Sequence, residues 1–184
     1  MTPHLYGMEA LTAAKKRGLV SVPVYGVLTD YTCIPFFAET ALNGYFIPHP
    51  ELIGEMVDKG IPKERLFPLG IPVSARFNLN ETKAQAREKT GLSQSGELYL
   101  VMSGGVGCGN LSELCDELLC RASGEFSVCV ITGRNEKLRE QLSGRYFDDG
   151  RVSVLGFTEK VGLYMRAADV LISKAGGLSS TEAA

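Results

Sequence analysis

Two short glycine-containing loops, each placed between a predicted strand and the start of a predicted helix, could bind phosphate groups. Residues 103–109 follow the apolar segment 98–102, and residues 174–178 follow the apolar segment 170–173. Glycine lets the backbone come close to an anion, and the first amides of a helix have no partner within that helix. Two such loops favour a ligand with two phosphates, such as a nucleoside diphosphate.

Three side chains near other predicted loops could contact the rest of a nucleotide. Arg134 offers a charge and a planar fork of donors, and Phe157 offers an aromatic ring to a base. Glu182, in the first turn of the last predicted helix, could accept hydrogen bonds from two neighbouring ribose hydroxyls. Each also has a structural alternative: an exposed helix residue for Arg134, a core residue for Phe157 and a charge near a helix dipole for Glu182.

Strand and helix patterns alternate along the whole chain, which predicts an α/β fold with parallel sheets. We expect strands at 20–28, 45–47, 66–69, 97–102, 128–132, 152–155 and 170–173, with the first buried on both faces. We expect helices from about 5 to 17, 50 to 59, 80 to 90, 111 to 122, 136 to 142, 159 to 167 and from about 179 onward. Because ligands bind beyond the carboxyl ends of parallel strands, the candidate loops should share one edge of a sheet.

A polar stretch divides the chain. Residues 74–96 separate an N-terminal part from four regular strand–helix units, so we predict domains at residues 1–75 and 76–184. The chain begins almost directly in a helix and ends one turn into another, with no residue that closes it. We therefore expect a piece of a longer protein, truncated at both ends.

The composition argues against several classes of function. A formal net charge of −2 and a pI of about 5.8 argue against general nucleic-acid binding. No apolar run reaches the roughly 18 residues that a membrane span needs, and no signal-peptide pattern begins the chain. The five cysteines include no CxxC pair and the chain has only two histidines, so we expect reduced thiols and no zinc site.

A more specific signal comes from short segments spread over nearly the whole chain. They are Val27-Leu28-Thr29-Asp30-Tyr31, Tyr45-Phe46-Ile47-Pro48, Gly70-Ile71-Pro72-Val73, Met102-Ser103-Gly104-Gly105-Val106-Gly107, Thr132-Gly133-Arg134-Asn135, Val154-Leu155-Gly156-Phe157-Thr158 and the stretch from Ile172 to Ala183. Together and in this order, they resemble the monogalactosyldiacylglycerol synthase and processive diacylglycerol glucosyltransferase family. That family is related to the N-acetylglucosaminyltransferase that completes lipid II.

The resemblance implies a GT-B fold, in which two Rossmann-like domains face a cleft. The N-terminal domain would take a lipid acceptor, most often diacylglycerol, at the inner face of the cell membrane, and the C-terminal domain would hold a UDP-sugar. The implied reaction is inverting hexose transfer with no metal or other cofactor. Backbone amides of the glycine loops would meet the diphosphate, Phe157 the uracil and Glu182 the ribose. The implied nucleotide-sugar site comprises Gly104, Gly105, Gly107, Arg134, Asn135, Phe157, Gly176, Gly177, Leu178, Ser179 and Glu182.

The resemblance assigns no catalytic base within this sequence. The family's candidate base is a histidine in a glycine-rich loop that would precede residue 1, and only His4 and His49 are present. We carry no catalytic role onto His4, and we expect His49 to be a surface or capping residue. Asp30 is the acceptor-side candidate, with a helix cap as its structural alternative. Because the opening acceptor loop and the closing helices of the family would lie outside this sequence, we expect these 184 residues alone to show no transferase activity.

Three alternative functions stay open. The loop at 103–109 superficially suits the dinucleotide of a nicotinamide or flavin oxidoreductase, but Gly105-Val106-Gly107-Cys108-Gly109 does not match GxGxxG. In addition, no acidic residue ends the predicted strand at 128–132. The second alternative is a nucleotide-binding module without turnover, and the third is a UDP-N-acetylglucosamine transferase of the lipid-II type.

Overall fold

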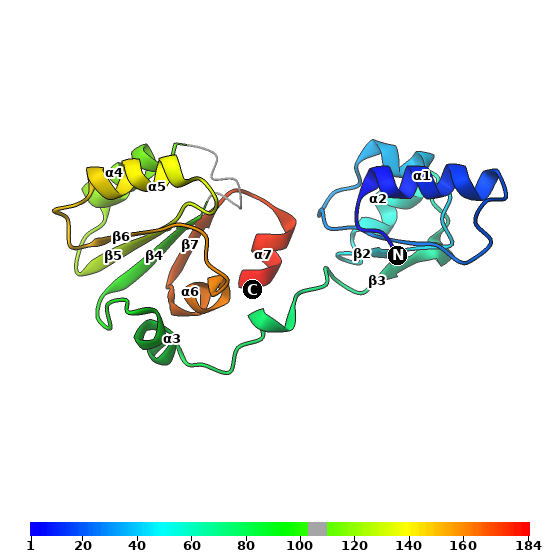
Figure 1. The fold of residues 1–184 in the computed structure, drawn as a ribbon. Coiled ribbons are helices and arrows are strands. Elements are labelled where there is room, and N and C mark those ends of the chain that lie inside the picture. The colour runs from blue at the N-terminus through cyan, green and yellow to red at the C-terminus, as the bar shows by residue number, and fades with distance from the viewer. Residues whose placement is uncertain (103–109) are drawn as a thin grey trace. The chain divides into compact units, whose positions relative to one another are not determined.

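The computed structural model describes residues 1–102 and 110–184, which divide into two compact units (Figure 1). Unit 1 comprises Met1–Val73, and unit 2 comprises Ser74–Ala184. Each unit holds a parallel sheet with helices packed against it. The α/β class that the alternating sequence pattern predicts is therefore confirmed.

Unit 1 is built on three parallel strands in the order β1-β2-β3. Met8 and Met56, from its two helices, are fully buried in one hydrophobic core with Tyr45 and Ile47 of the central strand. The elements are α1 (Leu5–Lys16), β1 (Tyr25–Val27), β2 (Gly44–Ile47), α2 (Leu52–Asp58) and β3 (Leu66–Pro68), with 3-10 turns at Pro35–Glu39 and Lys63–Arg65.

The first strand is much shorter than the sequence predicts. It covers only Tyr25–Val27 instead of 20–28, and residues 21–23 are exposed. Pro23 has no amide hydrogen to offer a neighbouring strand. The amide of Val24 donates to the side-chain Oδ1 of Asn43, at 2.9 Å, rather than to a strand partner. The apolar run before Val24 therefore crosses the surface, and the prediction that it is a strand buried on both faces is wrong.

Unit 2 contains four parallel strands in the order β6-β5-β4-β7. Its strands are β4 (Glu97–Met102), β5 (Phe126–Ile131), β6 (Val152–Leu155) and β7 (Val170–Ser173). Its helices are α3 (Lys83–Thr90), α4 (Leu111–Arg121), α5 (Glu136–Arg145), α6 (Val161–Ala167) and α7 (Gly177–Ala183), with a 3-10 turn at Ala75–Phe77.

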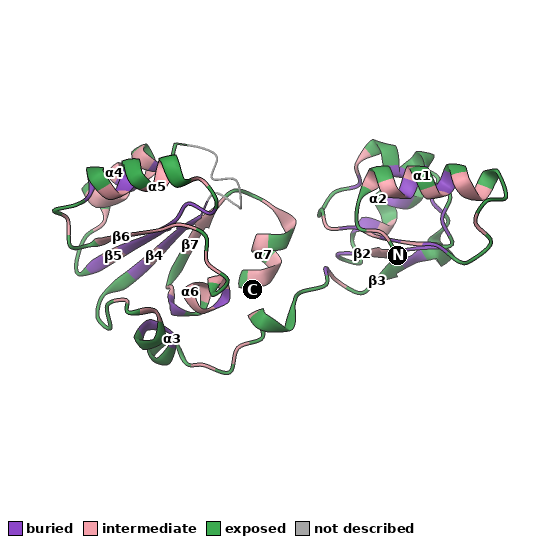
Figure 2. Cartoon of the chain, in the orientation of Figure 1, coloured by how far each residue is buried: buried purple, intermediate pink, exposed green. Residues whose placement is uncertain are grey.

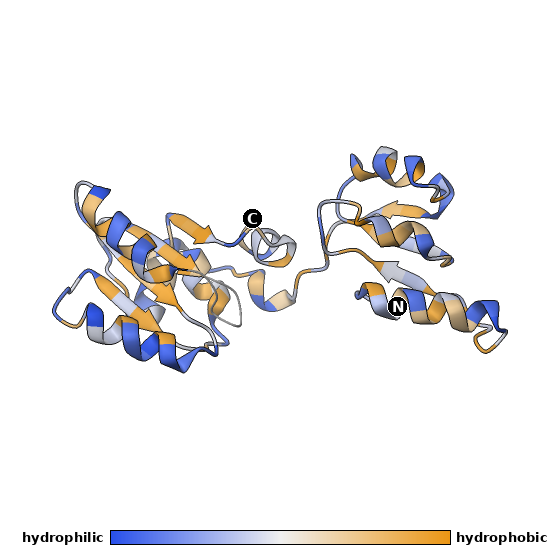
Figure 3. Cartoon of the chain, turned by 90° about the horizontal axis from the view of Figure 1, so that it is seen from above, coloured by the Kyte–Doolittle hydropathy of each residue, from blue (hydrophilic) through white to orange (hydrophobic). Residues whose placement is uncertain are grey.

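Helices cover both faces of the sheet of unit 2, and buried residues fill its central strands (Figure 2). Helices α4 and α5 pack on the face that carries Val101, Val128 and Val130, while α3 and α6 pack on the face that carries Leu100 and Cys129. The helices themselves alternate hydrophobic and hydrophilic residues around their turns, as one apolar face requires (Figure 3).

The strand order of unit 2 marks where a ligand is expected. Strands β4, β5 and β6 follow one another across the sheet, whereas β7 lies on the other side of β4. The chain order therefore reverses between β4 and β7, which makes a topological switch point at the carboxyl ends of these two strands. Open α/β sheets bind their ligands at such points.

Side chains define several helix ends. Thr82 and Gln85 form a reciprocal capping box, so α3 starts at Lys83 rather than at 80. At α4 only half of the capping box that the sequence predicts is present: Asn110 Oδ1 accepts from the Glu113 amide at 3.3 Å, and the Glu113 carboxylate contacts the Asn110 side chain instead of its backbone. Helix α7 begins at Gly177, two residues before the predicted start.

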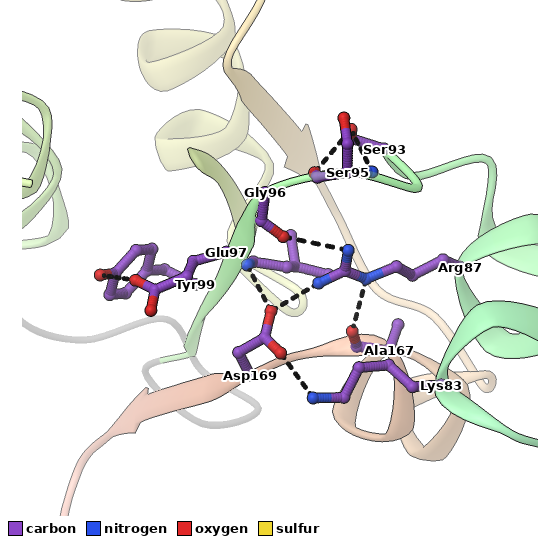
Figure 4. A network of polar contacts seen from close by, with 10 residues as sticks. Lys83, Arg87, Ser93, Ser95, Gly96, Glu97, Tyr99, Ala167 and Asp169 are labelled. Carbon is purple, nitrogen blue, oxygen red and sulfur yellow. Dashed lines mark hydrogen bonds and ion pairs between the residues drawn. The ribbon is translucent and has the colours of Figure 1, made fainter. Parts of the chain in front are cut away.

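A buried arginine fastens α3 to the sheet (Figure 4). Only 5% of Arg87 is exposed. Its Nε donates to the carbonyl of Ala167, its Nη1 donates to the carbonyl of Gly96, both at 3.1 Å, and its Nη2 pairs with the Asp169 carboxylate at 2.5 Å. One guanidinium thus joins α3 to the end of α6 and to the residues that precede β4 and β7.

The carboxylate of Asp169 is the centre of the same network (Figure 4). Besides Arg87, it accepts from the amide of Leu98 at 2.8 Å and pairs with Lys83 at 2.5 Å. The hydrogen bond from Lys83 is the main reason that the pKa of Asp169 is lowered, and burial opposes it. Three donors on two elements therefore favour the ionised form of this carboxyl.

The lowered pKa of Asp169 predicts a loss of stability in acid. The stabilisation is fully present above the pKa of an unfolded aspartate, about 3.9, and is lost as the pH falls through the lower folded value. We expect the urea midpoint of unit 2, measured by circular dichroism, to fall as the pH drops below about 4. The Asp169→Asn variant should be less stable at neutral pH but lose less on acidification. Parallel pH curves for the two proteins would contradict this.

Candidate functional site

A cavity of about 190 Å³ lies in unit 2 beyond the carboxyl ends of β4, β5 and β6. Its apolar wall includes Met102, Ile131 and Val161, and its polar wall includes Ser179 and Glu182 of α7. The remaining lining residues are Arg76, Phe77, Gly133, Phe157, Thr158 and Glu159. Pockets that enclose a whole drug-sized ligand are typically larger, about 300–1,000 Å³. The size and the mixed lining suit one ring system with a polar substituent.

Phe157 presents its ring to this cavity from the loop after β6. The residue is 59% exposed, so the alternative that it belongs to the core is wrong. The guanidinium carbon of Arg134, an exposed residue after β5, lies 5.4 Å from the centroid of that ring. This is a cation–π contact, and it joins two of the sequence-predicted residues. An exposed ring at a cavity mouth can stack on a planar base.

Glu182 is half-buried in the polar wall. Burial raises the pKa of its carboxyl, and the positive charge of Arg76 acts in the opposite direction. Within residues 1–102 and 110–184, no hydrogen bond or ion pair engages this carboxylate. A half-buried carboxylate without a partner can accept hydrogen bonds from a ligand, and two adjacent hydroxyls match its two oxygens.

Sequence reasoning missed Arg76 and Phe77, which also line the cavity. They belong to the 3-10 turn Ala75–Phe77, in a stretch that the sequence indicates only as a polar linker. Their contact with α6 is close at Gly162, where an added Cβ would lie 3.1 Å from the carbonyl oxygen of Arg76 and 3.2 Å from Cδ1 of Phe77. In the sequence, the one feature that could have pointed to these two residues is a cation followed by an aromatic residue within a polar segment.

The other sequence-predicted residues are placed less directly. Gly176 precedes α7 and accepts from Ser180, while Gly177 and the half-exposed Leu178 begin the helix; of this loop only Ser179 lines the cavity. Asn135 Oδ1 accepts from the amide of Leu138 at 3.0 Å and caps α5. Gly104, Gly105 and Gly107 lie outside the described residues. The described loops after β5, β6 and β7 follow parallel strands and so share one edge of the sheet.

A second, more open groove in unit 2 has a different character. It has a volume of about 590 Å³ and lies near the amino ends of the strands, away from the switch point. Both of its arginines are already paired with carboxylates, Arg145 with Asp116 and Arg151 with Asp149. We therefore place the candidate site at the 190 Å³ cavity.

Unit 1 has a cavity of about 630 Å³ next to the end of β1. Its lining includes Asp30, which is exposed, together with His4 and Phe36. His4 caps α1, because its Nδ1 accepts from the amide of Tyr6 at 3.3 Å. His49 is exposed, as expected for a surface residue, and its Nδ1 accepts from the amide of Glu51 at 3.3 Å, in the turn before α2.

The described cysteines are free thiols, and the lengths of the described helices bear on membrane crossing. Cys33, Cys115 and Cys129 are buried, Cys120 is exposed, and none of these four is in a disulfide. Burial raises the pKa of Cys115 to about 11 and of Cys129 to about 12, so both stay protonated near neutral pH. Within residues 1–102 and 110–184, no helix has the length and hydrophobicity that crossing a membrane requires.

Comparisons with known proteins assign each unit. Residues 2–73 match the family model of monogalactosyldiacylglycerol (MGDG) synthase. Residues 99–184 match the C-terminal domain of glycosyltransferase family 28. The first match covers nearly all of unit 1, and the second begins within β4 and contains β5, β6 and β7.

Processive diacylglycerol beta-glucosyltransferases are similar over the whole length of this chain. Those of Bacillus thuringiensis (strain Al Hakam), Bacillus cereus (strain AH187) and Bacillus anthracis (strain A0248) are each 29% identical over 183 residues. The alignment covers 98% of this chain and 47% of each relative, so the chain spans about half the length of the curated relatives it matches. With both family models matched in order, the chain is similar over nearly its whole length to monogalactosyldiacylglycerol synthases and processive diacylglycerol glucosyltransferases.

Proposed function

We propose that the protein acts in the inverting transfer of a hexose from a UDP-sugar to a membrane lipid, with diacylglycerol as the acceptor. The observation that carries this proposal is the cavity of unit 2 at the carboxyl edge of a parallel sheet. It is lined by the exposed ring of Phe157 and by the carboxylate of Glu182, which has no hydrogen-bond or ion-pair partner among the described residues. An aromatic ring can stack on the uracil base, and a carboxylate can accept hydrogen bonds from the two ribose hydroxyls. The relatives named above are diacylglycerol glucosyltransferases, which supports the choice of acceptor.

In this proposal the two units have separate roles. Residues 76–184 form the donor domain, where Phe157 stacks on the uracil, Arg134 borders the pocket and Glu182 binds the ribose. The cavity of about 190 Å³ is suited to the nucleoside, so the diphosphate extends from it toward the amides of Gly176, Gly177, Leu178 and Ser179. Gly104, Gly105 and Gly107 complete the diphosphate site, and Asn135 lies at its rim.

The chemistry of this site is electrostatic. Transfer of the hexose leaves UDP with additional negative charge, and backbone amides aimed at the diphosphate stabilise that charge without a metal ion or other cofactor. Residues 1–75 form part of the acceptor domain, with Asp30 in the acceptor-side cavity. The protein would then bind the inner face of the cell membrane peripherally, because its acceptor is a membrane lipid.

Isothermal titration calorimetry with UDP tests the proposal. We expect saturable binding of UDP, with a weaker but detectable response to uridine because the cavity holds the nucleoside. NADH, titrated by its own fluorescence, should not bind, since the dinucleotide alternative lacks its motif. Absence of UDP binding at millimolar concentration, or NADH binding in its place, would overturn the assignment of the donor site.

Removing the ring of Phe157 should weaken UDP binding. Base–aromatic stacking contributes about 1–3 kcal/mol per base, and we expect the lower end, about a fivefold increase in Kd for Phe157→Ala, because the ring keeps some solvent contact. Phe147→Ala is the matched control, since Phe147 is 84% exposed in the same unit but lines the other groove. A similar Kd for wild type and Phe157→Ala would remove the stacking role.

A further inference from the structure

Arg76 is a charged side chain in the candidate site to which the sequence and the comparisons assign no role. Of the described residues that line the cavity, it is the one lysine or arginine, and it shares that cavity with the carboxylates of Glu159 and Glu182. We infer that Arg76 is a positioning residue of the nucleotide site: its positive charge acts on the bound ribose through the Glu182 carboxylate, with which it shares the cavity. This inference rests on the proposed binding of a uridine nucleotide.

The chain holds Arg76 firmly at the cavity. The backbone of its 3-10 turn lies against Gly162 of α6, where a Cβ would meet the Arg76 carbonyl oxygen at 3.1 Å. The amide of Phe77 donates to the carbonyl of Ser74 at 3.0 Å and closes the turn. The guanidinium carbon lies 5.0 Å from the centroid of the Phe77 ring, and this ring also lines the cavity. Both backbone packing and a cation–π contact therefore fix the cation on the unit that contains Glu182.

The charges of the cavity explain why such a cation is needed. Glu182 is half-buried, and burial disfavours its charged form, whereas the charge of Arg76 favours it. A protonated carboxyl donates one hydrogen bond and accepts fewer, so it matches two hydroxyl donors less well. Without Arg76, two carboxylates would also face a nucleotide that is itself anionic. Arg76 therefore acts on the nucleotide through Glu182.

Direct contact between Arg76 and the diphosphate is the competing role, and a double-mutant cycle separates the two. The variants are Arg76→Ala, Glu182→Gln and the double variant, with UDP binding measured by calorimetry and uridine binding by competition. If Arg76 acts through Glu182, we expect Arg76→Ala to weaken UDP and uridine alike by about five- to tenfold. In the Glu182→Gln background the same substitution should change either Kd by less than about twofold.

Two further variants control for effects on folding. Arg76→Lys keeps the cation and should restore UDP binding to within about threefold of wild type, which a merely structural role would not produce. Arg121→Ala removes an arginine that is 80% exposed on α4, outside the cavity lining, and should bind UDP as wild type does. Circular dichroism checks that each variant is folded.

The outcomes are distinct. Equal losses from Arg76→Ala in both backgrounds, or a loss for UDP without one for uridine, would overturn the inference in favour of direct phosphate contact. Unchanged binding by Arg76→Ala, with wild type binding UDP normally, would overturn the inference and leave the proposed function intact. Failure of the wild-type chain to bind UDP and uridine would overturn both.

Discussion

Replacing Arg87 with alanine should lower the free energy of unfolding of unit 2 by about 3 kcal/mol, the range found when one partner of a buried ion pair is removed. The side chain is almost fully buried and donates to two carbonyls besides its carboxylate. Its loss leaves the carbonyl of the buried Ala167 without this donor and removes one cation from Asp169. Urea unfolding followed by hydrogen exchange in peptides from β4 and β7 measures the effect.

The same carboxylate supplies a matched control. Lys83 also pairs with Asp169, but half of its side chain is exposed. Exposed ion pairs contribute little, so Lys83→Ala should cost less than about 1 kcal/mol. Arg87→Lys should resemble the alanine variant more than wild type, because one ammonium cannot reach three acceptors in a fixed fork. Equal costs for Arg87→Ala and Lys83→Ala would show that burial of the guanidinium is unimportant.

Replacing Glu182 with alanine should raise the Kd for UDP by about 10- to 100-fold. Hydrogen bonds to a charged group contribute about 1.5–3 kcal/mol, which corresponds to that range. Inorganic diphosphate, which has no ribose, should bind the variant and wild type with the same affinity. Calorimetry with the two ligands on the two proteins gives the four values that are needed.

Two comparisons make the result for Glu182 specific. Glu117→Ala removes an exposed carboxylate of α4 that pairs with Arg121, and it should leave UDP binding unchanged. Glu182→Gln keeps the shape and one acceptor oxygen, so its Kd should lie between those of wild type and the alanine variant. An equal loss for UDP and diphosphate in Glu182→Ala would mean that the residue supports the loop rather than the ribose.

Much of the fold of unit 2 can be predicted from local sequence patterns. Its strands are apolar runs whose bounds the structure reproduces within two residues, and α3 ends where Gly91 adopts a φ of 70°. Both signals are local. A strand buried on two faces requires a continuous run of apolar residues, and the left-handed residue that ends a helix is usually a glycine. The polar sequence of α3 nevertheless gave no sign that Arg87 is buried, since its partner Asp169 is far away in the chain.

The candidate site could be predicted in part, for the same reason. Phe157, Ser179 and Glu182 follow strands whose carboxyl ends must share an edge once the sheet is parallel, so topology alone brings them together. Arg76 and Phe77 precede the whole sheet and reach the cavity only through packing against Gly162. No periodicity or motif in the sequence indicates this contact with Gly162. The position of β7 beside β4 is equally non-local.

That position has a consequence for biosynthesis. β4 emerges from the ribosome long before β7, so one of its edges waits without a strand partner while β5 and β6 are being made. An unpaired strand edge is a template for pairing with other chains. During this interval Asp169 is also absent, and the guanidinium of Arg87 has no counter-ion. Until residues 169–173 are translated, the nascent chain therefore exposes this edge of β4 to pairing with other chains.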